Sequence, residues 1–191
     1  MTRAAGNSLS AEVPRDTVVR HMRTYLMGRI FMKAFGHPIH PMLVVFPLGL
    51  LTTSLIFDVI GMATHNGTWH YVAEYLIGAG VVGGLVAGLF GLIDWTGIPK
   101  RTRARRIGAW HGGVNLIVLL IFFWSWFLRL ASSSQPPANA LILSFFGVGL
   151  ALVGGWLGGE LVEQLGVGVD PSANVNAPNS LSHETRPKHA A

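Results

Sequence analysis

The chain contains no cysteine among its 191 residues. Disulfide bonds, thiolate metal sites and cysteine nucleophiles are therefore all excluded. Charge is also scarce, because Asp, Glu, Lys and Arg make up only 12% of the chain, whereas soluble domains carry about 25%. Half of the residues are hydrophobic and the mean hydropathy is +0.46. This composition predicts an integral membrane protein with a single compact bundle.

The familiar motifs of hydrolytic and transfer enzymes are missing as well. The sequence has no phosphate-binding glycine loop, no nucleophile elbow and no His-Glu-x-x-His metalloprotease helix. We therefore expect that the protein is not a stand-alone enzyme.

Four apolar segments are each long enough to cross a hydrocarbon core of about 30 Å as a helix. They are Met42–Met62, Tyr71–Ile93, Trp110–Leu130 and Ala140–Leu161. Short connections force neighbouring helices to run antiparallel, so the predicted fold is an all-α, up-and-down four-helix membrane bundle.

The chain divides into three parts by composition. Residues 1–36 are basic, with apolar residues at helical spacing, and predict a cytoplasmic amphipathic segment on the inner leaflet. Residues 37–165 form the predicted transmembrane domain. Residues 166–191 contain turn formers without an apolar period and predict a disordered cytoplasmic tail.

Lysine and arginine are distributed unequally among the connections. Six precede the first span and five lie in the segment 94–109, whereas the segment 63–70 has none. The positive-inside rule therefore predicts a multi-pass protein of the bacterial inner membrane with both termini in the cytoplasm. The net charge of +5 and the pI near 10.2 are then explained by anionic lipids as partners, and no nucleic-acid partner is expected.

Glycines recur at intervals of four in two of the spans. The second span has Gly80, Gly84 and Gly88, and the fourth pairs Gly154 with Gly158 and Gly155 with Gly159. Small residues at this spacing predict close helix packing in lipid, against neighbouring spans or a second subunit. The alternative is that they leave room for a flat cofactor ring.

Polar side chains cluster at two depths. At the predicted cytoplasmic boundary, every span contributes a side chain that could act as a ligand: His37, His40, Asp94, His111 and Glu160. A second and looser set, Asp58, His65, His70 and Glu74, is expected on the outer side. Ionisable residues inside a membrane protein are expensive and indicate a functional site by default.

Three hypotheses fit the first set. A b-type haem could lie between His40 (or His37) and His111, which implies electron transfer to a redox partner protein. A transition metal could bind His37, His40 and His111 with Asp94 or Glu160. The third hypothesis is a structural or interaction subunit without a cofactor.

Four motifs together resemble one bacterial family. They are GHPIHP (36–41), GLIDW (91–95), WHGGVNL (110–116) and GGWLGGELVEQLGVGVD (154–170). In this combination the chain resembles the four-span membrane proteins grouped as domain of unknown function 2231, over residues 35–170. The resemblance implies an inner-membrane four-helix bundle and selects His37, His40, Asp94, His111 and Glu160. Some members are joined to Rieske iron–sulfur domains, which hints at electron transfer, although this chain has no cysteine for such a cluster.

Overall fold

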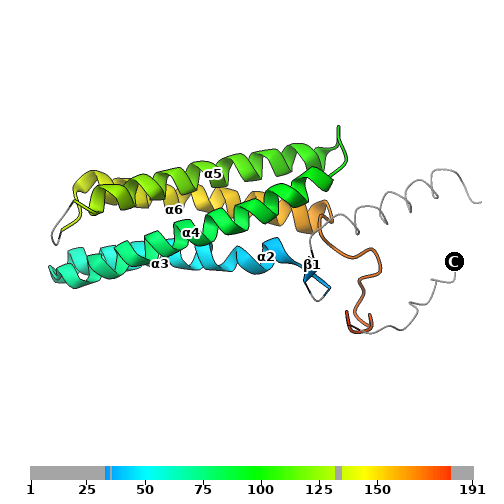
Figure 1. Ribbon diagram of the computed structural model, residues 1–191, viewed down its shortest axis with the longest axis horizontal. Helices are drawn as coiled ribbons and strands as arrows, with labels where there is room; N and C mark the ends of the chain where they lie inside the picture. The colour runs from blue at the N-terminus through cyan, green and yellow to red at the C-terminus, as the bar shows by residue number, and fades with distance from the viewer. Residues whose placement is uncertain (1–32, 35, 132–134, 182–191) are drawn as a thin grey trace, which may run out of the picture.

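The computed structural model describes residues 33–34, 36–131 and 135–181. Four long helices lie side by side in an elongated bundle (Figure 1). They are α3 (Val45–Thr64), α4 (Gly67–Gly97), α5 (Arg103–Arg129) and α6 (Ala138–Gly159). Helix α3 is preceded by the short helix α2 (Ile39–Leu43), and α6 continues into the π-helical turn η1 (Glu160–Gln164).

The predicted four-helix membrane bundle is confirmed. Four helical segments, Ile39–Thr64, Gly67–Gly97, Arg103–Arg129 and Ala138–Gln164, are long and apolar enough to span a membrane. All four begin before the predicted spans. Polar and basic residues at the ends extend the helices beyond the apolar windows, as Thr102 does by capping α5 through its side chain.

The first span contains a break that proline explains. Helix α2 ends at Leu43 and α3 begins at Val45. Pro47 has no N–H to donate to the carbonyl group of Leu43, so the regular hydrogen-bond ladder is interrupted at this point. The break separates the turn that carries His40 from the rest of the span.

Neighbouring helices in the bundle are α3 with α4, α4 with α5, α5 with α6, and α6 with α3. Helices α3 and α5 therefore lie diagonally opposite each other and run in the same direction. Between the two ends of the bundle the core is apolar. Its buried members are Leu51, Ile77, Val81, Val118 and Phe122.

The segment before the bundle forms a small hairpin. Strand β1 (Lys33–Ala34) pairs antiparallel with β2 (His37–Pro38). Gly36 supplies the turn with a φ of +83°, in the left-handed region that favours glycine. The predicted amphipathic helix lies outside the described residues. Residues 166–181 contain turns and no helix or strand, and Ser180 lies against Gly36.

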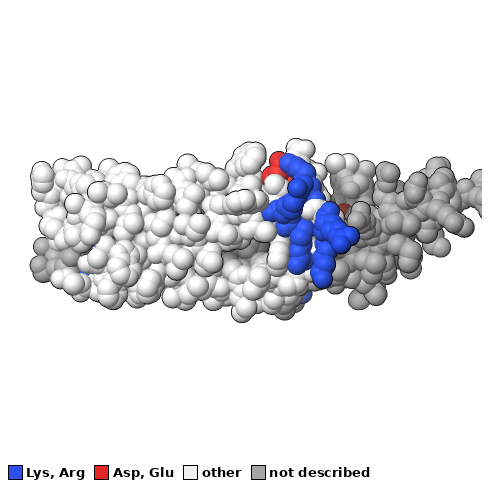
Figure 2. All heavy atoms as spheres, turned by 90° about the horizontal axis from the view of Figure 1, so that it is seen from above, with Lys and Arg blue, Asp and Glu red and all other residues white. Residues whose placement is uncertain are grey.

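The exposed Lys and Arg side chains of the described residues gather at one end of the bundle. Figure 2 shows them where α4 and α5 connect, while the long side of the bundle is almost entirely white. Large apolar side chains such as Leu85, Leu116 and Phe146 are exposed along this length. This distribution is what a lipid-facing surface requires.

The glycine pattern is only partly confirmed as a packing device. A Cβ atom at Gly80 would lie 2.6 Å from Leu51 Cδ2, and one at Gly84 would collide with Leu119. In contrast, nothing lies within 4 Å of the Cβ positions of Gly88 and Gly155. Gly155 therefore faces outward from α6 and does not pack against another described helix of this chain, contrary to the expectation for neighbouring spans.

We expect Gly84→Leu to lower the melting temperature of the protein in detergent by several degrees, because overpacking costs about 1–3 kcal/mol. Gly88→Leu, one turn further along α4, is the matched control and should melt with the wild type. Equal melting of the two variants would contradict the packing of α4 against Leu119.

Candidate cofactor site and a buried ion-pair network

His40 and His111 face each other across one end of the bundle. His40 lies in α2 and His111 near the start of α5, so the two imidazoles come from diagonally opposite spans. Their ring centroids are 6.3 Å apart and their planes are inclined at 87°. The predicted convergence of these two histidines is therefore present in the structure.

The same kind of hydrogen bond orients both rings. His40 Nδ1 lies 2.8 Å from the carbonyl oxygen of Ala87, and His111 Nδ1 lies 2.9 Å from that of Gly154. A carbonyl oxygen only accepts, so each Nδ1 carries the proton and donates it. In the neutral ring, Nε2 is then left with a lone pair. Metal-binding histidines are commonly oriented in this way.

Glycine makes room for each ring on the neighbouring helix. A Cβ atom at Gly91 would lie 2.8 Å from His40 Cε1, and one at Gly158 would lie 3.1 Å from His111 Cε1. The hypothesis that glycine accommodates a flat ring is thus met by the imidazoles themselves. Each glycine lies one turn after the residue whose carbonyl group accepts from the same histidine.

Three further predicted ligands remain to be placed: His37, Asp94 and Glu160. His37 is exposed in β2, and Glu160 forms an ion pair with Arg103 at 2.5 Å. Asp94 is buried near the end of α4. Among residues 33–34, 36–131 and 135–181, no three His, Asp or Glu side chains gather as a metal site. Of the five predicted residues, His40 and His111 are the two that the structure shows facing each other.

The end of α4 is fixed to the start of α5 by one arginine. Arg105 Nη1 donates to the carbonyl oxygens of Trp95, Thr96 and Ile98, and its guanidinium lies 3.7 Å from the centre of the Trp95 ring. The Trp95 indole N–H in turn donates to the carbonyl group of Arg105. Residues Trp95 and Arg105 thus fix the turn beside the histidine pair.

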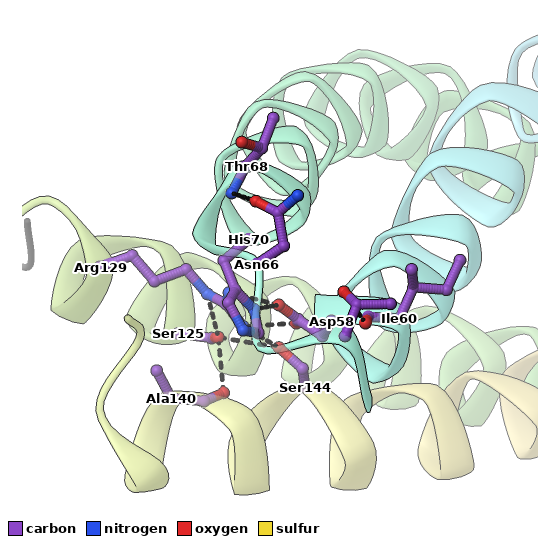
Figure 3. A network of polar contacts seen from close by, with 10 residues as sticks. Asp58, Ile60, Asn66, Thr68, His70, Ser125, Arg129, Ala140 and Ser144 are labelled. Atoms are coloured by element: carbon purple, nitrogen blue, oxygen red, sulfur yellow. Dashed lines mark hydrogen bonds and ion pairs between the residues drawn. The ribbon is translucent and has the colours of Figure 1, made fainter. Parts of the chain in front are cut away.

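A second polar cluster occupies the opposite end of the bundle (Figure 3). Arg129 donates from Nη1 to Asp58 Oδ1 at 2.9 Å and from Nη2 to Asp58 Oδ2 at 2.7 Å. His70 Nδ1 donates to Asp58 Oδ1 at 2.9 Å. Asp58 is 0% exposed, Arg129 2% and His70 4%. This is a bidentate ion pair held inside the protein.

Serine hydroxyl groups complete this cluster. Arg129 Nη2 donates to Ser144 Oγ at 3.1 Å, and Ser125 Oγ donates to the carbonyl group of Ala140 at 2.8 Å. The two serine oxygens lie 2.9 Å apart. All four long helices therefore contribute to the network. One atom stands out: His70 Nε2 is buried without a hydrogen-bond partner and faces Gly61, where a Cβ would lie 2.7 Å from it.

The sequence predicts Asp58 and His70 as members of a loose outer set and assigns no role to Arg129. That description is wrong for His70, which is buried in α4, whereas His65 is exposed at the C-cap of α3. Asp58 lies within an apolar segment and Arg129 lies at the edge of another. A charged residue in such a place is the sequence feature that could have indicated a buried ion pair. Nothing in the sequence indicated that they pair with each other, because the register between α3 and α5 is set by packing.

The network predicts strong thermodynamic coupling between Asp58 and Arg129. Asp58→Asn and Arg129→Met should each lower the free energy of unfolding by about 3–5 kcal/mol, because each leaves an uncompensated buried charge. The double variant should lose clearly less than the sum of the two. Denaturation in detergent measures all three.

The control for this cycle is Arg103→Met, which breaks the more exposed ion pair with Glu160. It should change stability by about 1 kcal/mol or less. Additive effects of Asp58→Asn and Arg129→Met would contradict the coupling.

Comparison with known proteins agrees with this architecture. The family described as "Predicted membrane protein (DUF2231)" matches residues 36–171, from the turn at Gly36 to just beyond η1. No curated protein and no solved structure matches the chain. The match covers more than half of the 191 residues. The chain therefore belongs to the DUF2231 family of predicted membrane proteins.

Proposed function

We propose that this membrane protein is a redox module in which His40 and His111 bind the metal of a b-type haem, or a transition metal ion, near one membrane boundary. The spacing of the two imidazoles supports this most directly. Their ring centroids lie 6.3 Å apart. A histidine nitrogen binds a metal ion at about 2.0 Å, so two rings this close are within reach of one shared ion.

The chemistry of the two rings agrees with this function. Both donate Nδ1–H to a backbone carbonyl group, which fixes the tautomer whose Nε2 can bind a metal. Both side chains are half-buried at the end of an apolar bundle. A bound metal centre would be shielded from bulk water there while remaining close to the surface, where a partner protein could exchange electrons with it.

The test is the cofactor content of the protein purified from cells supplied with a haem precursor and transition metals. We expect an absorption spectrum of bound haem, or a stoichiometric metal, in the wild type. His40→Ala and His111→Ala should abolish it while the protein remains folded by size-exclusion chromatography and thermal melting, because each removes one of two ligands.

His65→Ala is the matched control, since His65 is exposed at the other end of the bundle. His37→Ala should also retain the cofactor, because His37 lies in β2 outside the pair. A colourless, metal-free wild-type protein would refute the proposal, and a structural subunit without a cofactor would then be the better account.

We further propose that the histidine end of the bundle faces the cytoplasm. Lys100, Arg101, Arg103 and Arg106 lie at this end in the connection between α4 and α5 or at the start of α5. This basic surface suits the anionic headgroups of the inner leaflet. The connection between α3 and α4 at the other end has no Lys or Arg.

A topology reporter tests the orientation. A reporter that is active only in the periplasm should be silent after Ala191 and active when inserted at Asn66, in the turn between α3 and α4. Periplasmic activity at the C-terminus would reverse the orientation without affecting the histidine pair.

A further inference from the structure

We infer that the two helical hairpins, α3–α4 and α5–α6, are repeats related by a two-fold axis along the bundle, and that a metalloporphyrin binds on this axis with His40 and His111 as its two axial ligands. This inference rests on the proposed function and narrows it. The competing possibility is a metal ion that His40 and His111 bind without a porphyrin.

Helices α3 and α5 repeat the same buried positions. His111 precedes Arg129 by the same number of residues as His40 precedes Asp58. When His40 is aligned with His111 and Asp58 with Arg129, three buried residues of α3 also align with three buried residues of α5. The corresponding pairs are Pro47 with Val118, Leu51 with Phe122, and Ser54 with Ser125.

Helices α4 and α6 repeat in the same way. A Cβ at Gly91 would press on His40, and one at Gly158 would press on His111. Two other glycines make a second matched set of contacts. A Cβ at Gly80 would press on Leu51, and one at Gly147 would press on Phe122.

The repeat continues to the far end and to the hydrogen bonds. Ala73 precedes Gly91 by as many residues as Ala140 precedes Gly158. Both alanines are 0% exposed. Ala87 and Gly154 likewise lie one turn before Gly91 and Gly158. The carbonyl group of Ala87 accepts from His40, and that of Gly154 accepts from His111. Contacts, burial and hydrogen bonds thus agree on one superposition of the hairpins. The spans it exchanges run in the same direction, so the axis lies along the bundle.

The axis passes between the two histidines and restricts what they can bind. Residues exchanged by a two-fold axis present equivalent nitrogen atoms to a ligand centred on it. In the described part of the chain no third His, Asp or Glu completes a metal site with them. Structural zinc sites need four protein ligands. The iron of a porphyrin needs only two from the protein, since the macrocycle supplies the other four.

Glycine allows both imidazoles to pack closely against a neighbouring helix. Glycine stands beside both rings, at Gly91 and Gly158, and a further glycine, Gly154, stands beside Asn115. At all three positions an added Cβ would approach a polar side chain to 3.1 Å or less. The two imidazoles thus occupy equivalent places against α4 and α6, in the space that Gly91 and Gly158 leave.

The experiment measures binding of iron protoporphyrin IX, Cu(I) and Zn(II), each alone, to the full chain in lipid nanodiscs. We expect one haem per chain and no carbon monoxide binding by the reduced form, because both axial positions are occupied. His40→Ala and His111→Ala should each weaken haem binding at least about tenfold. Any haem that either variant retains should bind carbon monoxide.

The symmetry is tested by matched glycine variants. Gly91→Ala and Gly158→Ala should both weaken haem binding, with the larger effect at Gly91, where the added Cβ comes closer to the ring. Gly88→Ala and Gly155→Ala are the controls on the same two helices, with nothing within 4 Å of the added Cβ. Thermal melting of all variants separates loss of the site from loss of the fold.

Each outcome decides between the two proposals. Histidine-dependent binding of copper or zinc without haem would overturn this inference and leave the proposed function standing as a metal site. Haem binding that depends on only one of the two histidines would overturn the axial pair alone. Absence of binding by all three probes would refute both.

Discussion

Asp58 and Arg129 are enclosed in an apolar bundle without access to water, and their attraction constrains the packing of the helices around them. A carboxylate or a guanidinium left alone there would be far more costly than in a soluble protein, because neither lipid nor the core can solvate it. The two must therefore meet with both hydrogen bonds made, as they do. This fixes the rotation and the register of α3 relative to α5, and His70 and Ser144 extend the constraint to α4 and α6.

The fixed register at one end determines what meets at the other. From Asp58 to His40, and from Arg129 to His111, the helices run 18 residues, which is about 27 Å at a rise of 1.5 Å per residue. Once the ion pair is formed, the two imidazoles are brought to the same depth on facing spans. The buried hydrophobic core between them consists of Leu51, Ile77, Val81, Val118 and Phe122. Each cluster thus lies near one boundary of a hydrocarbon layer of about 30 Å.

The repeated hairpins also explain why the ion pair has opposite charges at equivalent positions. Two copies of one hairpin, placed about the same axis, would bring Asp58 against Asp58 or Arg129 against Arg129. Like charges buried together are strongly unfavourable, so α3–α4 is selected to pair with α5–α6. The histidine end needs no such difference between the hairpins, because two identical neutral imidazoles can both bind the same metal.

The sequence by itself determined the four spans, the all-α bundle and the family, because long apolar segments leave the backbone no other way to satisfy its hydrogen bonds in lipid. It also selected His40 and His111, whose positions at the ends of two spans follow from counting residues. Only the tertiary structure decided that Glu160 pairs with Arg103, that Gly155 faces outward and that Gly84 does not. It alone joined Asp58 to Arg129 and buried His70. These outcomes depend on the rotation of each helix about its own axis, and nearly uniform apolar segments carry no periodic signal that would fix that rotation before the helices pack.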